Sequence, residues 1–97
     1  MATYIVLMNL TDQGIRNVKQ IPERRKAGAA AAEKLGIKVK EAYSTLGAYD
    51  GVAVVDAPND EAITTWALSV GSLGYIHTQT MRAFSADEMS NILAKIP

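Results

Sequence analysis

Two short segments of this chain are apolar at both odd and even positions, and this pattern restricts the fold more than any other feature. They are residues 3–10, TYIVLMNL, and residues 50–57, DGVAVVDA. Successive side chains of a β-strand point to opposite faces of the sheet. A strand that is apolar on both faces is typical of the centre of a sheet, where both faces require burial.

Two further segments have the character of edge strands. Residues 37–47 alternate, so that Val39, Glu41 and Tyr43 should share one face and the lysines the other. Residues 75–84, YIHTQTMRAF, have no clean apolar face. An edge strand tolerates polar side chains on both faces because one of its sides meets water.

The segments between the strands carry helix signals. Thr11 or Asp12 can cap a helix that runs from about residue 14, and Pro22 should break and restart it. Gly36 is a typical stop for this helix. Residues 58–74 predict a second helix that begins at Asn59 or Asp60, and residues 85–96 predict a third with capping-box spacing.

The resulting order is strand, helix, strand, strand, helix, strand, with a trailing helix. This order predicts an α+β fold of the ferredoxin-like βαββαβ type. Right-handed crossovers then give an antiparallel sheet of strand order 4-1-3-2, with the helices on one face. The chain of 97 residues is short enough to form a single domain over residues 1–97.

The opposite face of this sheet is apolar on both central strands, and a soluble monomer rarely exposes such a surface. We therefore expect a homodimer, or a higher homo-oligomer, in which two sheets pack face to face as a dimeric α+β barrel. One alternative is that the C-terminal helix folds over the free face. Another is that small residues such as Ala53 make the exposed patch tolerable.

The composition excludes several classes of function. Ten basic residues balance ten acidic ones, so no electrostatic attraction towards nucleic acid or an anionic membrane is expected. The absence of cysteine and the single histidine argue against a metal site, and no cofactor motif is present. The N-terminus has neither a signal-peptide pattern nor a membrane span, so we expect a cytoplasmic protein.

The predicted topology gathers sequence-distant polar residues at one end of the sheet. The end of the first strand, the start of the first helix, the hairpin and the start of the fourth strand should meet there. A small-molecule pocket in the barrel could also use polar side chains from the edge strands. The candidate ligand-binding residues are Asn9, Thr11, Tyr43, Tyr49, Asp50, His77 and Gln79.

Simpler roles compete with a binding site at these positions. Asp50 is an ordinary turn residue that can bond its own backbone, and Tyr49 can cap the core with its hydroxyl in water. His77 is a lone histidine on a strand, and its pairing with Asp50 would need a contact that the sequence does not establish. The basic run at residues 23–26, ERRK, is expected to form a solvated helix face.

Three separated blocks of the sequence resemble the GYD domain family. They are TYIVLMNLTDQGIRNVK, TLGAYDGVAVVDAPND and GSLGYIHTQTMRAF, which cover essentially the whole chain. Gly47, Tyr49 and Asp50 match the motif after which the family is named, with Ala48 as a spacer. The resemblance implies a bacterial or archaeal protein of the dimeric α+β barrel type, and it implies no particular activity.

Two functions fit these observations. The first is a non-catalytic homodimeric module that binds a small ligand or a partner protein in or near the barrel. The second is a cofactor-independent enzyme, of the oxygenase or isomerase type, that uses a barrel pocket with His77, Asp50, Tyr49 and Tyr43 as its titrating groups. The sequence names no catalytic residue, so whether the protein is an enzyme is left open.

Overall fold

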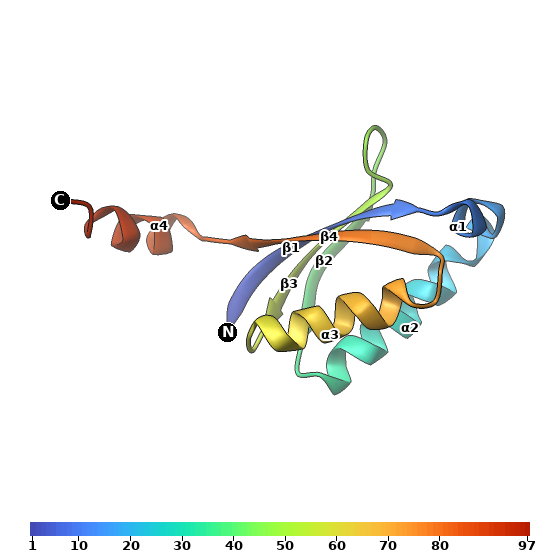
Figure 1. Cartoon of the computed structure of the whole chain (residues 1–97), viewed down its shortest axis with the longest axis horizontal. Coiled ribbons are helices and arrows are strands. Elements are labelled where there is room, and N and C mark those ends of the chain that lie inside the picture. Colours follow the sequence, from blue (N-terminus) through green and yellow to red (C-terminus); the bar gives the residue numbers. More distant parts are fainter.

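A computed structural model describes residues 1–97 and has the predicted order of elements (Figure 1). The elements are β1 (Ala2–Leu10), α1 (Asp12–Arg16), the 3-10 turn η1 (Val18–Gln20), α2 (Ile21–Lys34), β2 (Lys38–Ser44), β3 (Gly51–Ala57), α3 (Asp60–Gly71), β4 (Ile76–Ala83) and α4 (Ala86–Leu93). The four strands form one antiparallel sheet in the order β2-β3-β1-β4. The same order read from the other edge is 4-1-3-2, so the predicted ferredoxin-like topology is confirmed.

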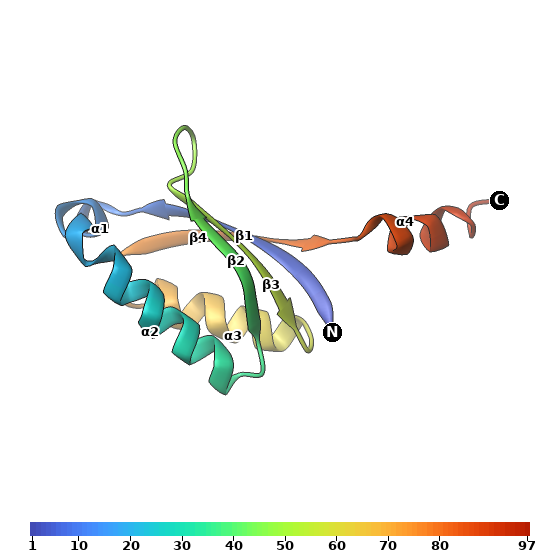
Figure 2. The ribbon, with the colours of Figure 1, turned by 180° about the vertical axis from the view of Figure 1, so that it is seen from behind.

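The helices α2 and α3 cover one face of the sheet and leave the other uncovered (Figures 1 and 2). Alternate residues of β3 show the difference: Ala53 and Val55 are buried against the helices, whereas Val52 and Val54 are half-buried on the uncovered face. The core of the chain lies between the helices and the sheet. It consists of Tyr4, Val6, Ala32, Ile37, Ala53, Val55, Ala57, Ile63 and Trp66.

The helix termini follow the local signals in the sequence. Thr11 accepts a hydrogen bond at its Oγ1 from the Gly14 N–H at 3.0 Å, and Asn59 accepts one at its Oδ1 from the Ala62 N–H at 2.9 Å. Such side chains satisfy backbone N–H groups that have no partner within the helix. At the start of α4, Ser85 forms the predicted capping box. Pro22 lies in the first turn of α2, where its missing N–H costs nothing.

Two side-chain hydrogen bonds hold α3 in place, one to the other helix and one to the sheet. The indole N–H of Trp66 on α3 donates to the carbonyl oxygen of Gly28 on α2, at 2.9 Å. The hydroxyl of Tyr4 on β1 donates to the carboxylate of Asp60 at the start of α3. This hydrogen bond raises the pKa of Tyr4 above its usual value, because the carboxylate holds the phenolic proton. Both bonds fix α3 against its neighbours.

A β-bulge changes the predicted faces of β2. The pairing of β2 with β3 shifts between Val39 and Glu41, where one extra residue is accommodated. Val39 therefore faces the helices with Val55, whereas Glu41 and Tyr43 lie beside Val54 and Val52 on the uncovered face. The prediction that Val39, Glu41 and Tyr43 share a face was wrong, because an inserted residue reverses the alternation.

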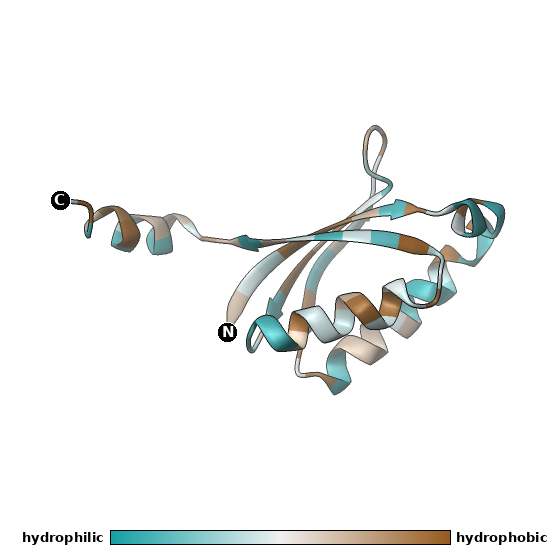
Figure 3. Ribbon diagram, viewed as in Figure 1, coloured by the Kyte–Doolittle hydropathy of each residue, from teal (hydrophilic) through white to brown (hydrophobic).

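The C-terminal helix does not fold over the uncovered face of its own sheet. Figure 1 shows α4 projecting beyond the end of β4, away from the other helices. The apolar residues of α4 are consequently open to solvent, including Leu93 at 54% and Ile96, just after the helix, at 63% of their maximal exposure. Figure 3 shows apolar residues along this exposed helix. The first alternative to dimerisation, in which the C-terminal helix folds over the free face of its own sheet, is therefore wrong.

None of the helices is both long enough and apolar enough to cross a membrane.

Candidate functional site

Four of the predicted binding residues meet at one end of the uncovered sheet face. Asn9 on β1 lies opposite His77 on β4, and Gln79 is two residues further along β4 on the same face. The Tyr49 hydroxyl donates a hydrogen bond to the Gln79 Oε1 at 2.9 Å, although the two residues are 30 positions apart. The hairpin therefore reaches across the sheet to the edge strand, at the end of the sheet where the topology predicted that the hairpin and the fourth strand meet.

Asp50 and Thr11 have structural partners at this same end. The Leu10 N–H donates to the Asp50 carboxylate at 2.8 Å, and the Asp50 N–H donates to the Met8 carbonyl oxygen at 2.9 Å. Asp50 therefore fastens the hairpin to β1, and no hydrogen bond joins its carboxylate to His77. Thr11 caps α1 and donates its hydroxyl to the Gly74 carbonyl oxygen at 2.6 Å.

Tyr43 is separated from the other candidates within one chain. It occupies the same row across the sheet as Val52, Leu7 and Gln79, in that order. Three strand spacings put it roughly 14 Å from Gln79 along this row. Its hydroxyl lies 3.3 Å from a carboxylate oxygen of Glu41, and its side chain is exposed. Tyr43 and Gln79 thus mark opposite edges of the uncovered face.

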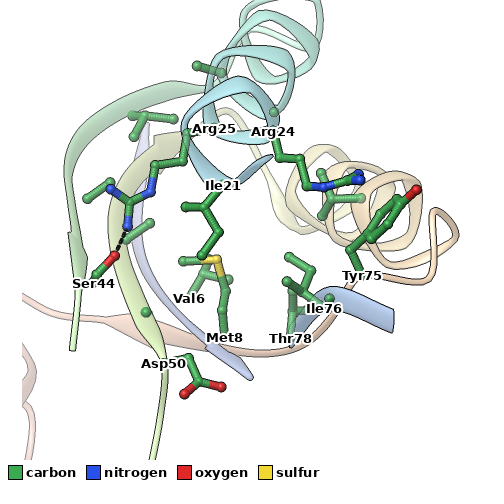
Figure 4. Close-up of a pocket in the computed structure, with 18 of the residues that line it drawn as sticks. Val6, Met8, Ile21, Arg24, Arg25, Ser44, Asp50, Tyr75, Ile76 and Thr78 are labelled. Atoms are coloured by element: carbon green, nitrogen blue, oxygen red, sulfur yellow. Dashed lines mark hydrogen bonds between the residues drawn. The ribbon is translucent and has the colours of Figure 1, made fainter. Parts of the chain in front are cut away.

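A cavity of about 390 Å³ lies on the other side of the sheet, beneath the helices (Figure 4). We call it the helix-side cavity. It is open to solvent at one side, and its walls come from β1, β2, β3, α1, α2, α3 and the start of β4. Its apolar lining includes Val6, Met8, Ile21, Ala53, Trp66 and Val70. The sequence did not predict this cavity, because its walls combine residues from seven elements.

Small residues explain why the space is not filled. Gly28 and Ala29 face it from α2, Ala42 and Ala53 from the sheet, and Ala67 from α3. Protein interiors are otherwise packed with few voids larger than a water molecule. The run of glycine and alanine in α2 was therefore the one sequence signal that could have indicated a hollow on this side.

The basic run of α2 borders this cavity, so the prediction that it forms only a solvated face was wrong for Arg24. The Arg24 guanidinium stacks on the Tyr75 ring at 3.0 Å from the centroid, and its Nε is buried without a hydrogen-bond partner. Arg25 donates to the Ser44 hydroxyl on β2. Figure 4 shows the two arginines diverging from α2 on either side of Ile21.

The two regions differ in the chemistry they offer. The end of the uncovered face presents hydrogen-bonding groups, namely two side-chain amides, a phenol and an imidazole, all at the solvent-facing side. The helix-side cavity presents an apolar wall with cations on α2 and a carboxylate, that of Asp50, across from them. Asp50 and Tyr43 are among the residues that border this cavity, although the Tyr43 side chain lies on the uncovered face, whereas Tyr49 and His77 do not border it.

Known proteins resemble this chain over almost its full length. A protein of Thermus thermophilus described as "Glutamine synthetase and cystathionine beta-lyase binding protein" is 34% identical over 90 residues, which are 92% of this chain and 95% of the relative. A crystal structure of a Thermus thermophilus protein superposes with a TM-score of 0.57 at 30% identity, covering 89% of this chain and 96% of that one.

Two further solved structures share the fold. A protein whose crystal structure is described under the name FFRP superposes with a TM-score of 0.54 at 26% identity, over 87% of this chain and 100% of its own. The leucine response regulatory protein LrpA of Mycobacterium tuberculosis has a TM-score of 0.57 at only 15% identity, and covers 88% of this chain and 51% of its own. At that identity the likeness to LrpA shows the fold alone.

The sequence profile of the GYD domain matches residues 4–93. This match spans all four strands and all the helices, and it includes the hairpin with Gly47, Tyr49 and Asp50. The profile and the Thermus relative agree with the architecture described above, so this chain belongs to the GYD domain family.

Proposed function

We propose that this protein is a homodimeric, non-catalytic binding module that docks on a partner protein. The observation that carries the proposal is the uncovered sheet face. Ile5 and Leu7 on β1 lie beside Val52 and Val54 on β3, with Met81 on β4 next to Ile5. These side chains form a continuous apolar patch across the two central strands, and a second copy of the same patch can cover it.

The dimensions of the sheet suit a two-fold interface. Four strands of about seven residues present a face of roughly 19 Å by 23 Å, or about 440 Å². A stable interface buries about 800 Å² on each partner. The hairpin between β2 and β3 rises on the uncovered side of the sheet (Figures 1 and 2), and Leu46 near its tip is fully exposed. Contacts from this hairpin would supply part of the remaining area.

The partner-binding part of the proposal draws on the relative. The Thermus thermophilus protein is described as binding two enzymes, glutamine synthetase and cystathionine β-lyase, and it matches this chain over nearly its whole length. We extend only the general mode, a small module that binds an enzyme, to this chain. The dimer presents each docking surface twice, which suits symmetric oligomeric partners.

A small ligand could also be held between the two sheets. The predicted binding residues Asn9, His77, Gln79 and Tyr49 flank the apolar patch, and Tyr43 borders its opposite edge. An enzymatic role would need these groups in a closed space, which within one chain they do not share because Tyr49 and His77 lie outside the helix-side cavity. The binding role requires no such enclosure.

Light scattering coupled to size exclusion tests the dimer. Wild-type protein at micromolar concentration should have twice the chain mass of 10.4 kDa. Leu7→Glu places a charge at the centre of the patch and should give a folded monomer, checked by circular dichroism. Leu73→Glu is the matched control, because Leu73 is exposed in the turn after α3 and lies outside the patch. A wild-type monomer at these concentrations would end the proposal.

The partner is tested with purified enzymes. Glutamine synthetase and cystathionine β-lyase from the cell that makes this protein are immobilised separately, and wild-type protein is passed over each in a biosensor. We expect saturable binding to at least one enzyme, with weaker apparent affinity for the Leu7→Glu monomer because its second contact is lost. Absence of binding to both enzymes by a dimeric wild type would refute the partner assignment while leaving the dimer intact.

A further inference from the structure

The helix-side cavity has the size and lining of a ligand pocket. Its volume of about 390 Å³ is at the small end of the range found for small-molecule sites. Its walls are dominated by aliphatic and aromatic side chains, including Val6, Met8 and Trp66. A space of this kind accommodates the apolar body of a small molecule, which gains free energy by leaving water.

The charges at this cavity are unbalanced. Arg24, Arg25 and Lys26 border it from α2, and none of them forms a salt bridge. The hydrogen-bonding partners of the two arginines are neutral: the Gln20 Oε1 for Arg24, at 2.6 Å, and the Ser44 hydroxyl for Arg25. In a chain with equal numbers of acidic and basic residues, three consecutive cations without a carboxylate partner are available for an external anion.

Arg24 has unused hydrogen-bonding capacity at a buried atom. Its Nε is shielded from water and has no acceptor, whereas most buried polar atoms in proteins are hydrogen-bonded. A buried donor without a partner costs free energy, and an anionic oxygen that reached it would remove this cost. The stacked Tyr75 ring holds the guanidinium in a fixed orientation, which reduces the entropy lost on binding.

Asp50 gives one end of the cavity a negative charge, opposite the cations on α2. Asp50 lies at the far end of the cavity from α2, where its carboxylate points away from the arginines and accepts a hydrogen bond from the Leu10 N–H (Figure 4). An anionic group is repelled at that side and attracted at the side of the arginines. The charge distribution therefore favours a ligand whose anionic group lies near Arg24, the arginine with the unpartnered Nε, while its apolar body extends into the cavity.

We propose that the helix-side cavity binds a small amphipathic anion, a carboxylate or phosphate on an apolar body, with Arg24 as the anion-binding residue. This site is on the opposite side of the sheet from the homodimer interface, so it does not depend on the proposed function. The ligand class follows from the apolar lining, the cations without salt bridges and the unpartnered Nε.

Trp66 provides a direct readout, because it is the only tryptophan of the chain and lines the cavity. Octanoate, octyl phosphate and octan-1-ol are titrated separately into the full-length protein, with tryptophan emission and melting temperature recorded. We expect a saturable emission change and a raised melting temperature with one or both anions, which identifies the preferred head group. Octan-1-ol, which has the same chain without the charge, should bind at least about tenfold more weakly.

Two matched pairs of variants locate the site. Arg24→Met should weaken anion binding at least about tenfold and leave octan-1-ol binding unchanged. Arg16→Met, which alters an exposed arginine paired with Asp12, should have no effect. Ala29→Leu enlarges a residue of the cavity wall and should weaken binding of all three probes, whereas Ala30→Leu alters a neighbour, exposed like Ala29, that does not line the cavity.

Three results would overturn the proposal. The first is no saturable response of wild-type protein to either anion. The second is equal affinity for octan-1-ol and the anions, since charge would then play no part. The third is an identical response of the variants and their controls, which would place the bound probe elsewhere. None of these measurements tests the mass of the assembly, so a negative result here would not refute the proposed dimer.

Discussion

Replacement of Gly14 by alanine should destabilise this protein, although helix propensity alone predicts the opposite. Alanine in a helix is favoured over glycine by about 0.5 to 1 kcal/mol. A Cβ added at Gly14, however, would lie 2.0 Å from the Tyr75 carbonyl oxygen and 3.2 Å from the Leu10 Cδ2. Atoms at the first distance cannot coexist, so either α1 or the loop before β4 must move.

The cost follows from what this movement breaks. The Tyr75 carbonyl oxygen accepts a hydrogen bond from the Thr11 N–H at 3.1 Å, and the Thr11 hydroxyl donates to the adjacent Gly74 carbonyl oxygen. Overpacking costs about 1 to 3 kcal/mol, and each lost hydrogen bond about 0.5 to 1.5 kcal/mol. After the gain in helix propensity is subtracted, the free energy of unfolding should fall by about 3 kcal/mol. For a domain of this size, this corresponds to a decrease of about 12 to 24 °C in melting temperature.

Gly28→Ala is the matched control. Gly28 is in the interior of α2, and a Cβ there would meet only Val70 Cγ1, at the ordinary contact distance of 4.0 Å. This variant should gain about 0.5 to 1 kcal/mol. Urea and thermal unfolding followed by circular dichroism, at one protein concentration because association affects stability, measure both changes. A Gly14→Ala protein as stable as wild type would refute the reasoning.

Two pH effects follow from perturbed side chains. Asp60 raises the pKa of Tyr4 through the hydrogen bond between their side chains. The stability that this hydrogen bond contributes is therefore complete below pH 10.0 and is lost as pH rises through the raised pKa. Tyr4→Phe should remove this part of the alkaline loss of stability in urea titrations. The Ser85 N–H and Arg82 lower the pKa of Glu88, so the capping of α4 is complete above pH 4.5 and weakens as pH falls. Helical circular dichroism should show this acid step in wild type, and Glu88→Gln should lack it.

Local chemistry in the sequence determined the elements and their order. Both faces of residues 3–10 and 50–57 are apolar, which placed β1 and β3 at the centre of the sheet. Short-range hydrogen bonds at Thr11, Asn59 and Ser85 fixed the helix starts, because a cap and its N–H partner are only three residues apart. Right-handed crossovers then allowed one strand order.

Tertiary structure alone decided what each face carries. The bulge in β2 places Tyr43 on the uncovered face. The sequence left open whether α4 covers this face, and in the structure α4 extends away from the sheet. The meeting of Tyr49 with Gln79, and of Arg24 with Tyr75, depends on contacts between residues far apart in the chain. The helix-side cavity likewise exists because small side chains from several elements face one another, and no single segment records that relation.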